Sequence, residues 1–303
     1  MSYEMFLENL LETTQHILGE GYHVCIDAVV RNNDTRKYVL RILREGMNIA
    51  PIIYLDSFYE AYRNGEQMEE ICRTLIRCYR RHVIPEHVDP DLFHSWETCR
   101  ERIVCRLIGR DRNRIRLEHL VSKPFLDMAV IYYYMFPTAE EGMAGTPITK
   151  SMLTGWGISV GELDQMAVSN TAALYPPSFV TMDQVMDELL QMQTVIREDP
   201  DGSSPLYVLS NTERLHGAYW IRDKKVMEDI CAKLHGDVWV LPSSIHECMI
   251  LPDRIPMDPK EMKSMVWEIN RTALDPEEVL TDSVYHYERG RGLSIAGMGA
   301  GTA

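Results

Sequence analysis

A polar cluster between two apolar runs is the part of this sequence best suited to chemistry. Residues 238–252 read VWVLPSSIHECMILP, so Ser243, Ser244, His246 and Glu247 bring hydroxyl, imidazole and carboxylate groups together beside expected core. These groups could supply the nucleophile, the base and the orienting acid of acyl transfer. A hydrolase that uses Ser243 or Ser244 with His246 and Glu247 is therefore one interpretation of the segment.

The same cluster also has a structural interpretation. Ser244-Ile-His-Glu247 has the Ser-x-x-Glu spacing of a capping box, in which a hydroxyl and a carboxylate satisfy backbone amides at the start of a helical turn. No Gly-x-Ser-x-Gly element surrounds the serines, and catalytic triads are assembled from separate segments. We therefore expect a capped turn between two strands, and such a cap leaves His246 unexplained.

A second polar segment follows an earlier predicted strand, residues 206–209, and contains Asn211 and His216. It follows its strand as His246 and Glu247 follow theirs. If the two loops face each other, these four side chains would line one concave surface. The sequence thus predicts a ligand-binding site formed by Asn211, His216, His246 and Glu247.

A basic segment stands out in an otherwise acidic chain. Residues 100–116 hold seven arginines and two acidic residues, a local charge of +5, and we expect a helix over 97–109. Four of the arginines recur every four residues, which would align them on one helical strip that could contact phosphates. These are Arg102, Arg106, Arg110 and Arg114. The alternative is a solvated face that pairs with acidic segments of this chain or of a partner.

The composition limits the class of protein. The 303 residues carry a net charge of −14, which disfavours nucleic acid and anionic membranes as general partners. The N-terminus does not resemble a signal peptide, and the most apolar window, residues 124–136, is shorter than the ~20 residues that span a bilayer. Seven cysteines without metal-site spacing are typical of buried thiols in the cytoplasm. The sequence predicts neither a metal site nor a cofactor.

Hydrophobic periodicity predicts an α+β fold in two modules. The first, residues 1–145, should hold helices with a small antiparallel sheet, in which a turn at 32–34 joins two strands. A Gly/Thr/Pro-rich passage at 141–147 should connect it to the second module, residues 146–288. That module should follow the order β-β-α-β-β-α, with its second strand at 218–221, and residues 289–303 should form a flexible tail. Capping boxes at Ser159 and Thr181 mark two helix starts.

Several segments together resemble one family, DUF5688, a bacterial domain-of-unknown-function group common in gut Firmicutes. The resemblance extends over residues 1–288 and implies no particular activity. The segments that carry it are Ala50–Leu55, Tyr59–Tyr62, Phe125–Asp127, Trp156–Ser159, Val208–Asn211, Gly217–Ala218, Leu241–Glu247 and Asp282–Tyr285.

These observations favour a non-enzymatic cytoplasmic protein that binds another protein or a small ligand. The hydrolase at Ser243 or Ser244 and nucleic-acid binding through Arg100–Arg116 are the alternatives.

Overall fold

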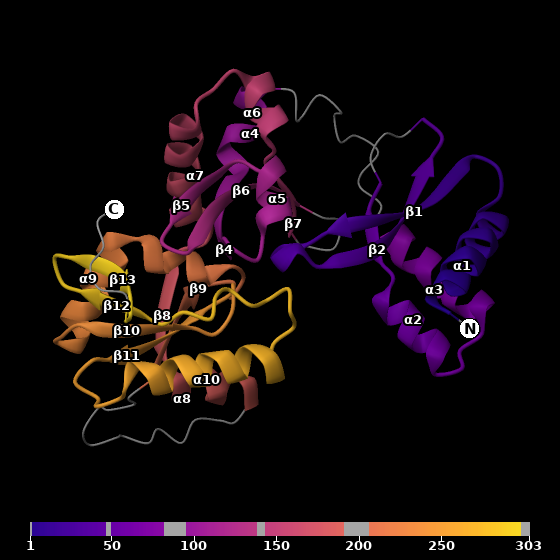
Figure 1. Cartoon of the computed structure of the whole chain (residues 1–303). Helices are drawn as coiled ribbons and strands as arrows, with labels where there is room; N and C mark the ends of the chain where they lie inside the picture. Colours follow the sequence, from indigo (N-terminus) through magenta and orange to yellow (C-terminus); the bar gives the residue numbers. More distant parts are fainter. Residues whose placement is uncertain (1, 47–49, 82–94, 138–142, 191–205, 298–303) are drawn as a thin grey trace.

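Three antiparallel sheets organise the chain in the computed structural model, which describes residues 2–46, 50–81, 95–137, 143–190 and 206–297 (Figure 1). A three-stranded N-terminal sheet lies to one side. A four-stranded and a six-stranded sheet lie next to each other and share one large hydrophobic core. Helices with antiparallel sheets confirm the predicted α+β class. No helix in the described part of the chain is long and apolar enough to cross a membrane.

The N-terminal unit is a long hairpin backed by helices. Its elements are α1 (Tyr3–Leu18), β1 (Tyr22–Val30), the 3₁₀ turn η1 (Asn32–Asp34), β2 (Arg36–Arg44), β3 (Ile52–Tyr54), α2 (Asp56–Arg63) and α3 (Met68–Arg81). The apolar faces of α1 and α3 bury Phe6, Leu10 and Leu75 against Leu40 and Ile42 of β2. Strands β1 and β2 pair over nine residues each, so their turn extends beyond this core toward the other sheets (Figure 1).

The middle of the chain forms the four-stranded sheet and its helices. The elements are α4 (Trp96–Cys99), η3 (Arg100–Arg102), β4 (Ile103–Gly109), α5 (Arg114–His119), β5 (Ser122–Phe125), β6 (Met128–Pro137), β7 (Met143–Pro147), α6 (Lys150–Trp156) and α7 (Val160–Leu174). Strand β6 pairs with β4 on one edge and with β5 and β7 on the other. The capping box that begins α7 at Ser159 is confirmed.

Two predictions for this region are wrong. The helix expected over 97–109 stops at Arg102, and residues 103–109 form β4. Both faces of this strand are covered, so its sequence is nearly continuously apolar and shows no period-two alternation. The connection expected at 141–147 includes β7, whose residues pair with β6. The proposed boundary at residue 145 therefore falls within a strand.

The last part of the chain forms the six-stranded sheet, in the order β13-β12-β10-β11-β9-β8. Its elements are β8 (Pro177–Thr181), α8 (Met182–Leu190), β9 (Tyr207–Asn211), η4 (Gly217–Arg222), α9 (Lys224–Leu234), β10 (Val238–Pro242), β11 (Cys248–Pro252), α10 (Pro259–Thr272), β12 (Tyr285–Glu288) and β13 (Gly292–Ile295). The reciprocal bonds between Thr181 and Gln184 that a capping box predicts are present at the start of α8.

The expected β-β-α-β-β-α order needs two corrections. Residues 218–221, expected as a strand, lie in the 3₁₀ turn η4, and their apolar side chains are buried against the sheet. The tail expected from residue 289 contains strand β13, which pairs with β12 through residues 292–295. Residues 298–303 lie outside the described residues.

Candidate ligand-binding site

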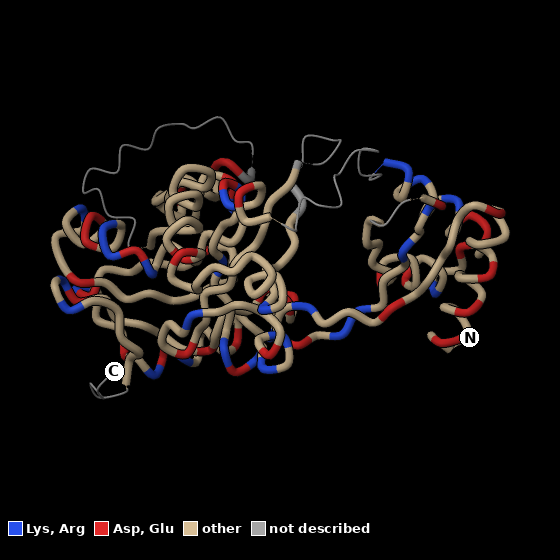
Figure 2. Tube along the Cα trace, turned by 90° about the horizontal axis from the view of Figure 1, so that it is seen from above, with Lys and Arg blue, Asp and Glu red and all other residues tan. Residues whose placement is uncertain are grey.

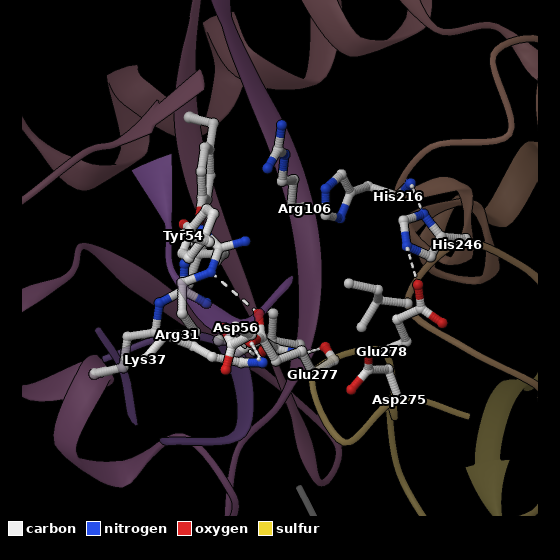
Figure 3. Close-up of a pocket in the computed structure, with 16 residues that line it drawn as sticks. Arg31, Lys37, Tyr54, Asp56, Arg106, His216, His246, Asp275, Glu277 and Glu278 are labelled. Carbon is white, nitrogen blue, oxygen red and sulfur yellow. Dashed lines mark hydrogen bonds and ion pairs between the residues drawn. The ribbon is translucent and has the colours of Figure 1, made fainter. Parts of the chain in front are cut away.

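A cavity of about 320 Å³ lies where the N-terminal hairpin meets the other two sheets (Figure 3). It is lined from all three parts of the chain. The polar lining residues are Arg31, Asn32, Lys37, Tyr54, Asp56, Arg106, Arg116, Tyr133, His216, His246, Asp275, Glu277 and Glu278. A larger hollow of about 800 Å³ adjoins it and shares Arg31, Tyr54, Arg106, Tyr133 and His216 with it.

The hairpin turn reaches the site because its polar side chains bond to distant segments. The Asn33 side-chain amide donates to the carbonyls of Pro276 and Val279 at 2.6 and 2.7 Å. The Asp34 carboxylate accepts from the backbone N–H groups of Ile115 and Arg116 at 2.9 and 3.1 Å, at the start of α5. The predicted turn at 32–34 therefore also docks the N-terminal unit and caps a helix of the next sheet.

Arg106 projects from β4 into the cavity (Figure 3), and its charge has no matching anion in the part of the chain that the structure describes. Its guanidinium carbon lies 3.8 Å from the centre of the Tyr133 ring, and Nη2 lies 3.4 Å from the Met135 sulfur. No carboxylate of the described residues forms an ion pair with it. Burial lowers the pKa of Arg106, although the group stays charged. Gly145 makes room for it, since a Cβ there would lie 3.2 Å from Nη2.

Two histidines stand beside Arg106. The His216 backbone N–H donates to His246 Nδ1 at 3.2 Å, and the ring centroids are 5.1 Å apart. The neutral His246 ring must then hold its proton on Nε2, which faces Glu278 Oε1 at 3.9 Å. His216 Nδ1 is buried and has no hydrogen-bond partner among the described residues.

The environment keeps both imidazoles neutral near pH 7. Burial, the charge of Arg106 and the neighbouring His246 hold the pKa of His216 well below its usual value of 6.5. Burial also lowers the pKa of His246, against the opposing effect of Glu278. Neutral imidazoles can each donate one hydrogen bond and accept another, so the pair can orient a polar ligand without adding charge.

The backbone around His216 explains its position. His216 has a φ of 58°, in the left-handed region, and Gly217 follows it. A Cβ on Gly217 would lie 2.4 Å from Ser210 Oγ and 2.5 Å from the Asn211 backbone nitrogen. Only glycine allows η4 to pack this closely on β9, which places the preceding imidazole at the cavity.

The structure brings together part of the predicted ligand set. His216 and His246 line the cavity. Asn211 lines the adjoining hollow, but its side chain bonds the Glu213 and Leu215 backbone. The Glu247 carboxylate lies near Ser243 Oγ, at 3.5 Å, and does not line the cavity. Ligand binding by these residues stays a prediction.

The serines of the polar cluster do not form the expected cap, and among the described residues neither hydroxyl is hydrogen-bonded to the His246 ring. Residues 243–247 make a non-helical connection between β10 and β11, so the predicted capping box is wrong. Ser244 Oγ accepts from the His246 backbone N–H at 3.0 Å, and Ser243 Oγ donates to the Glu247 carbonyl at 3.3 Å. Each hydroxyl bonds the backbone of its own loop, which is the usual role of serine in a turn.

The predicted arginine strip does not exist, because its helix is absent. Arg102 ends η3, Arg106 lies in β4, Arg110 follows β4 and Arg114 begins α5. Arg114 pairs with Asp111, and only Arg106 of the four lines the cavity. Figure 2 shows basic and acidic residues interspersed over the coloured part of the chain, without a continuous basic strip there.

Several lining residues gave no signal in the sequence. Arg31 and Tyr54 lie in the N-terminal unit, Tyr133 in an apolar run, and Glu277 and Glu278 in an acidic stretch. Each type is common in such a context, so their convergence depends on contacts between segments far apart in the chain.

Comparisons with known proteins identify the family and nothing more specific. No curated protein and no solved structure gives a significant match. The model of a family of unknown function, DUF5688, matches residues 3–289. The match covers nearly the whole chain, so this protein belongs to the DUF5688 family.

Proposed function

We propose that this protein binds a small ligand that presents an anionic group, a carboxylate or a phosphate, to Arg106. The observation that carries the proposal is the enclosed cation of Arg106, which has no anionic partner among the described residues. Beside it, the buried Nδ1 of His216 has no hydrogen-bond partner among those residues. Enclosing a charge is costly unless an opposite charge compensates it, so an anion at this point would recover the lost solvation.

The surroundings of Arg106 suit it to bind an anion of fixed orientation. Stacking on Tyr133 restrains the guanidinium, so little conformational freedom is lost when a ligand binds. A guanidinium can donate two parallel hydrogen bonds to a carboxylate or phosphate. The Arg116 side chain, which donates to the Tyr133 hydroxyl, adds a second positive charge to the same wall.

A small ligand is favoured over a protein partner because the unpartnered groups lie in a cavity of small-molecule size. Binding is favoured over hydrolysis because the Ser243 and Ser244 hydroxyls bond the backbone of their own loop. Cytoplasmic residence belongs to the same proposal, since thiols buried among apolar residues, such as Cys72 and Cys248, are typical of reducing compartments.

The test is an NMR titration with sodium acetate and sodium phosphate, against sodium chloride at equal ionic strength. We expect saturable shifts of cavity residues, and at least about tenfold weaker binding in Arg106→Met, since a charge-assisted hydrogen bond contributes ~1.5–3 kcal/mol. Arg110→Met, which removes an exposed arginine just after the same strand, is the matched control and should bind normally.

A variant that unfolds would show nothing about binding, so each variant is first checked by circular dichroism. His216→Asn provides a second route, because asparagine tolerates the left-handed backbone at this position. Equal binding by the wild type, Arg106→Met and His216→Asn would overturn the proposal. So would the absence of saturable binding by either anion.

A further inference from the structure

The cavity has an acidic side opposite its basic side. Figure 3 shows Arg106 and His216 on one side, with Asp275, Glu277 and Glu278 on the other. Arg31 pairs with Glu277 at 3.1 Å, and Lys37 pairs with Asp56 at 3.3 Å. These contacts compensate two of the four acidic groups that line the cavity.

Two carboxylates remain without a permanent cation. Asp275 forms no ion pair among the described residues, and Glu278 has only the neutral His246 ring, at 3.9 Å. Asp275 is exposed, and the Glu278 side chain is 46% exposed, so water solvates both where the cavity opens. Alone, such acidic residues would point to no ligand.

Asn32 supplies an independent observation at the same cavity. This side chain is only 7% exposed, and its Nδ2 donates to the Glu277 carbonyl at 2.6 Å. That bond fixes which end of the amide is oxygen, because the carbonyl needs a donor. Oδ1 is buried and has no hydrogen-bond partner among the described residues. Asn32 is one of the residues that line the cavity, so the wall holds a buried acceptor as well as a buried cation, and the missing partner of this acceptor must be an N–H or O–H group.

We propose that the ligand is a zwitterion of amino-acid size, with its carboxylate at Arg106 and its ammonium group at Asn32 Oδ1 beside Asp275 and Glu278. This rests on the proposed function and narrows its ligand class. An ammonium group would donate to Asn32 Oδ1 and lie next to two carboxylates that form no ion pair with Lys or Arg among the described residues. The volume of about 320 Å³ is that of roughly ten water molecules, which suits a ligand of about ten non-hydrogen atoms.

Two matched ligand series test the inference by isothermal titration calorimetry. The first is glycine, β-alanine, 4-aminobutyrate and 6-aminohexanoate, and the second is acetate, propionate, butyrate and hexanoate. The members of a pair share a chain length and differ only in the ammonium group. At one chain length we expect the amino acid to bind at least about tenfold more tightly than the plain carboxylate. This factor corresponds to the free energy of one charge-assisted hydrogen bond.

The double variant Asp275→Asn/Glu278→Gln should lose most of this preference, while its affinity for the plain carboxylates stays equal or rises. Both residues are partly or fully exposed, so the variant should fold. The matched control is Glu8→Gln/Glu12→Gln, which removes two exposed charges of α1 and should keep the preference. Asn32→Ala should also lower the preference, with its folding checked by thermal unfolding.

The outcomes separate the two proposals. If plain carboxylates bind as tightly as amino acids at every length, and Arg106→Met weakens both, the zwitterion is refuted and anion binding stands. If phosphate binds and neither organic series does, the same conclusion follows. If no anion or amino acid binds, both proposals are wrong.

Discussion

The two faces of the four-stranded sheet treat buried charge in opposite ways. Tyr132 and Tyr133 are neighbours on β6 and point to opposite faces. On the Tyr132 face, the Asp164 carboxylate accepts from Lys123 Nζ at 2.6 Å, from the Tyr132 hydroxyl at 2.9 Å and from Arg222 Nη2 at 3.3 Å. On the Tyr133 face, Arg106 contacts the Tyr133 ring and the Met135 sulfur, and no anion within the described ranges pairs with it.

The difference separates a structural cluster from a binding site. Burial raises the pKa of Asp164, but the bonds from Lys123 and Tyr132 and the charge of Arg222 outweigh it and leave that pKa below its usual value. The cluster is therefore complete within the chain. The Arg106 side is incomplete, and an incomplete buried polar network is where a ligand can supply the missing partner.

The largest expected effect is on the complete cluster. Asp164→Asn should lower the free energy of unfolding by about 2–3 kcal/mol, because Lys123 and Arg222 would lose their charged partner while water solvates part of each side chain. Urea denaturation monitored by circular dichroism measures this. A loss below about 1 kcal/mol would contradict the view that the cluster holds this face together.

The neighbouring tyrosines give a matched pair on one strand. Tyr132→Phe should cost about 1–2 kcal/mol, because Asp164 would lose the hydrogen bond from the fully buried Tyr132 hydroxyl. Tyr133→Phe should cost less than about 0.5 kcal/mol, since its hydroxyl accepts from the partly exposed Arg116 and its ring can still stack on Arg106. Both values come from the same urea experiment, and equal losses would remove the contrast between the faces.

Removal of the Arg106 charge should not lower the free energy of unfolding. Arg106→Met keeps an apolar chain of similar length against Tyr133 and removes an uncompensated charge, so its free energy of unfolding should equal that of the wild type or exceed it by about 1 kcal/mol. A marked loss of stability would mean that Arg106 has a structural role instead. This variant also removes the anion site, so stability and binding should change independently.

The smallest effect at neutral pH concerns His216, which is buried and lies near the positive charges of Arg106, Arg116 and Arg31. Its pKa is lowered in the folded protein, so below pH 6.5 the unfolded chain binds a proton that the folded chain does not. Stability should therefore be complete above that pH and fall as the pH drops below it. His216→Asn should have a flatter profile of urea midpoint against pH between 7 and about 5. Identical slopes in the two proteins would show that His216 does not titrate differently on folding.

Local signals in the sequence were sufficient for many helices and strands. The Ser159 capping box and the two strands that flank residues 243–247 depend on neighbouring residues, so their patterns predict them correctly. Residues 103–109 were wrongly predicted as helix because a strand covered on both faces lacks the alternation of apolar and polar residues that distinguishes a strand from a buried helix. The Ser244–Glu247 spacing does not form a capping box because Ser244 Oγ accepts from the His246 backbone N–H within a non-helical loop, and the Glu247 carboxylate lies near Ser243.

The candidate site shows the same division. The amino-acid pattern alone established an acidic α+β chain, its family resemblance, and two histidines placed after strands whose loops could meet. Folding determined that Arg106 and Arg116, two of the seven arginines in their segment, line a cavity with these histidines. It also brought Arg31 and Asn32 to the same place, through bonds from a turn to residues more than 240 positions away. The reason is physical: local patterns encode local geometry, whereas an unmatched charge is defined by all the groups that surround it in space.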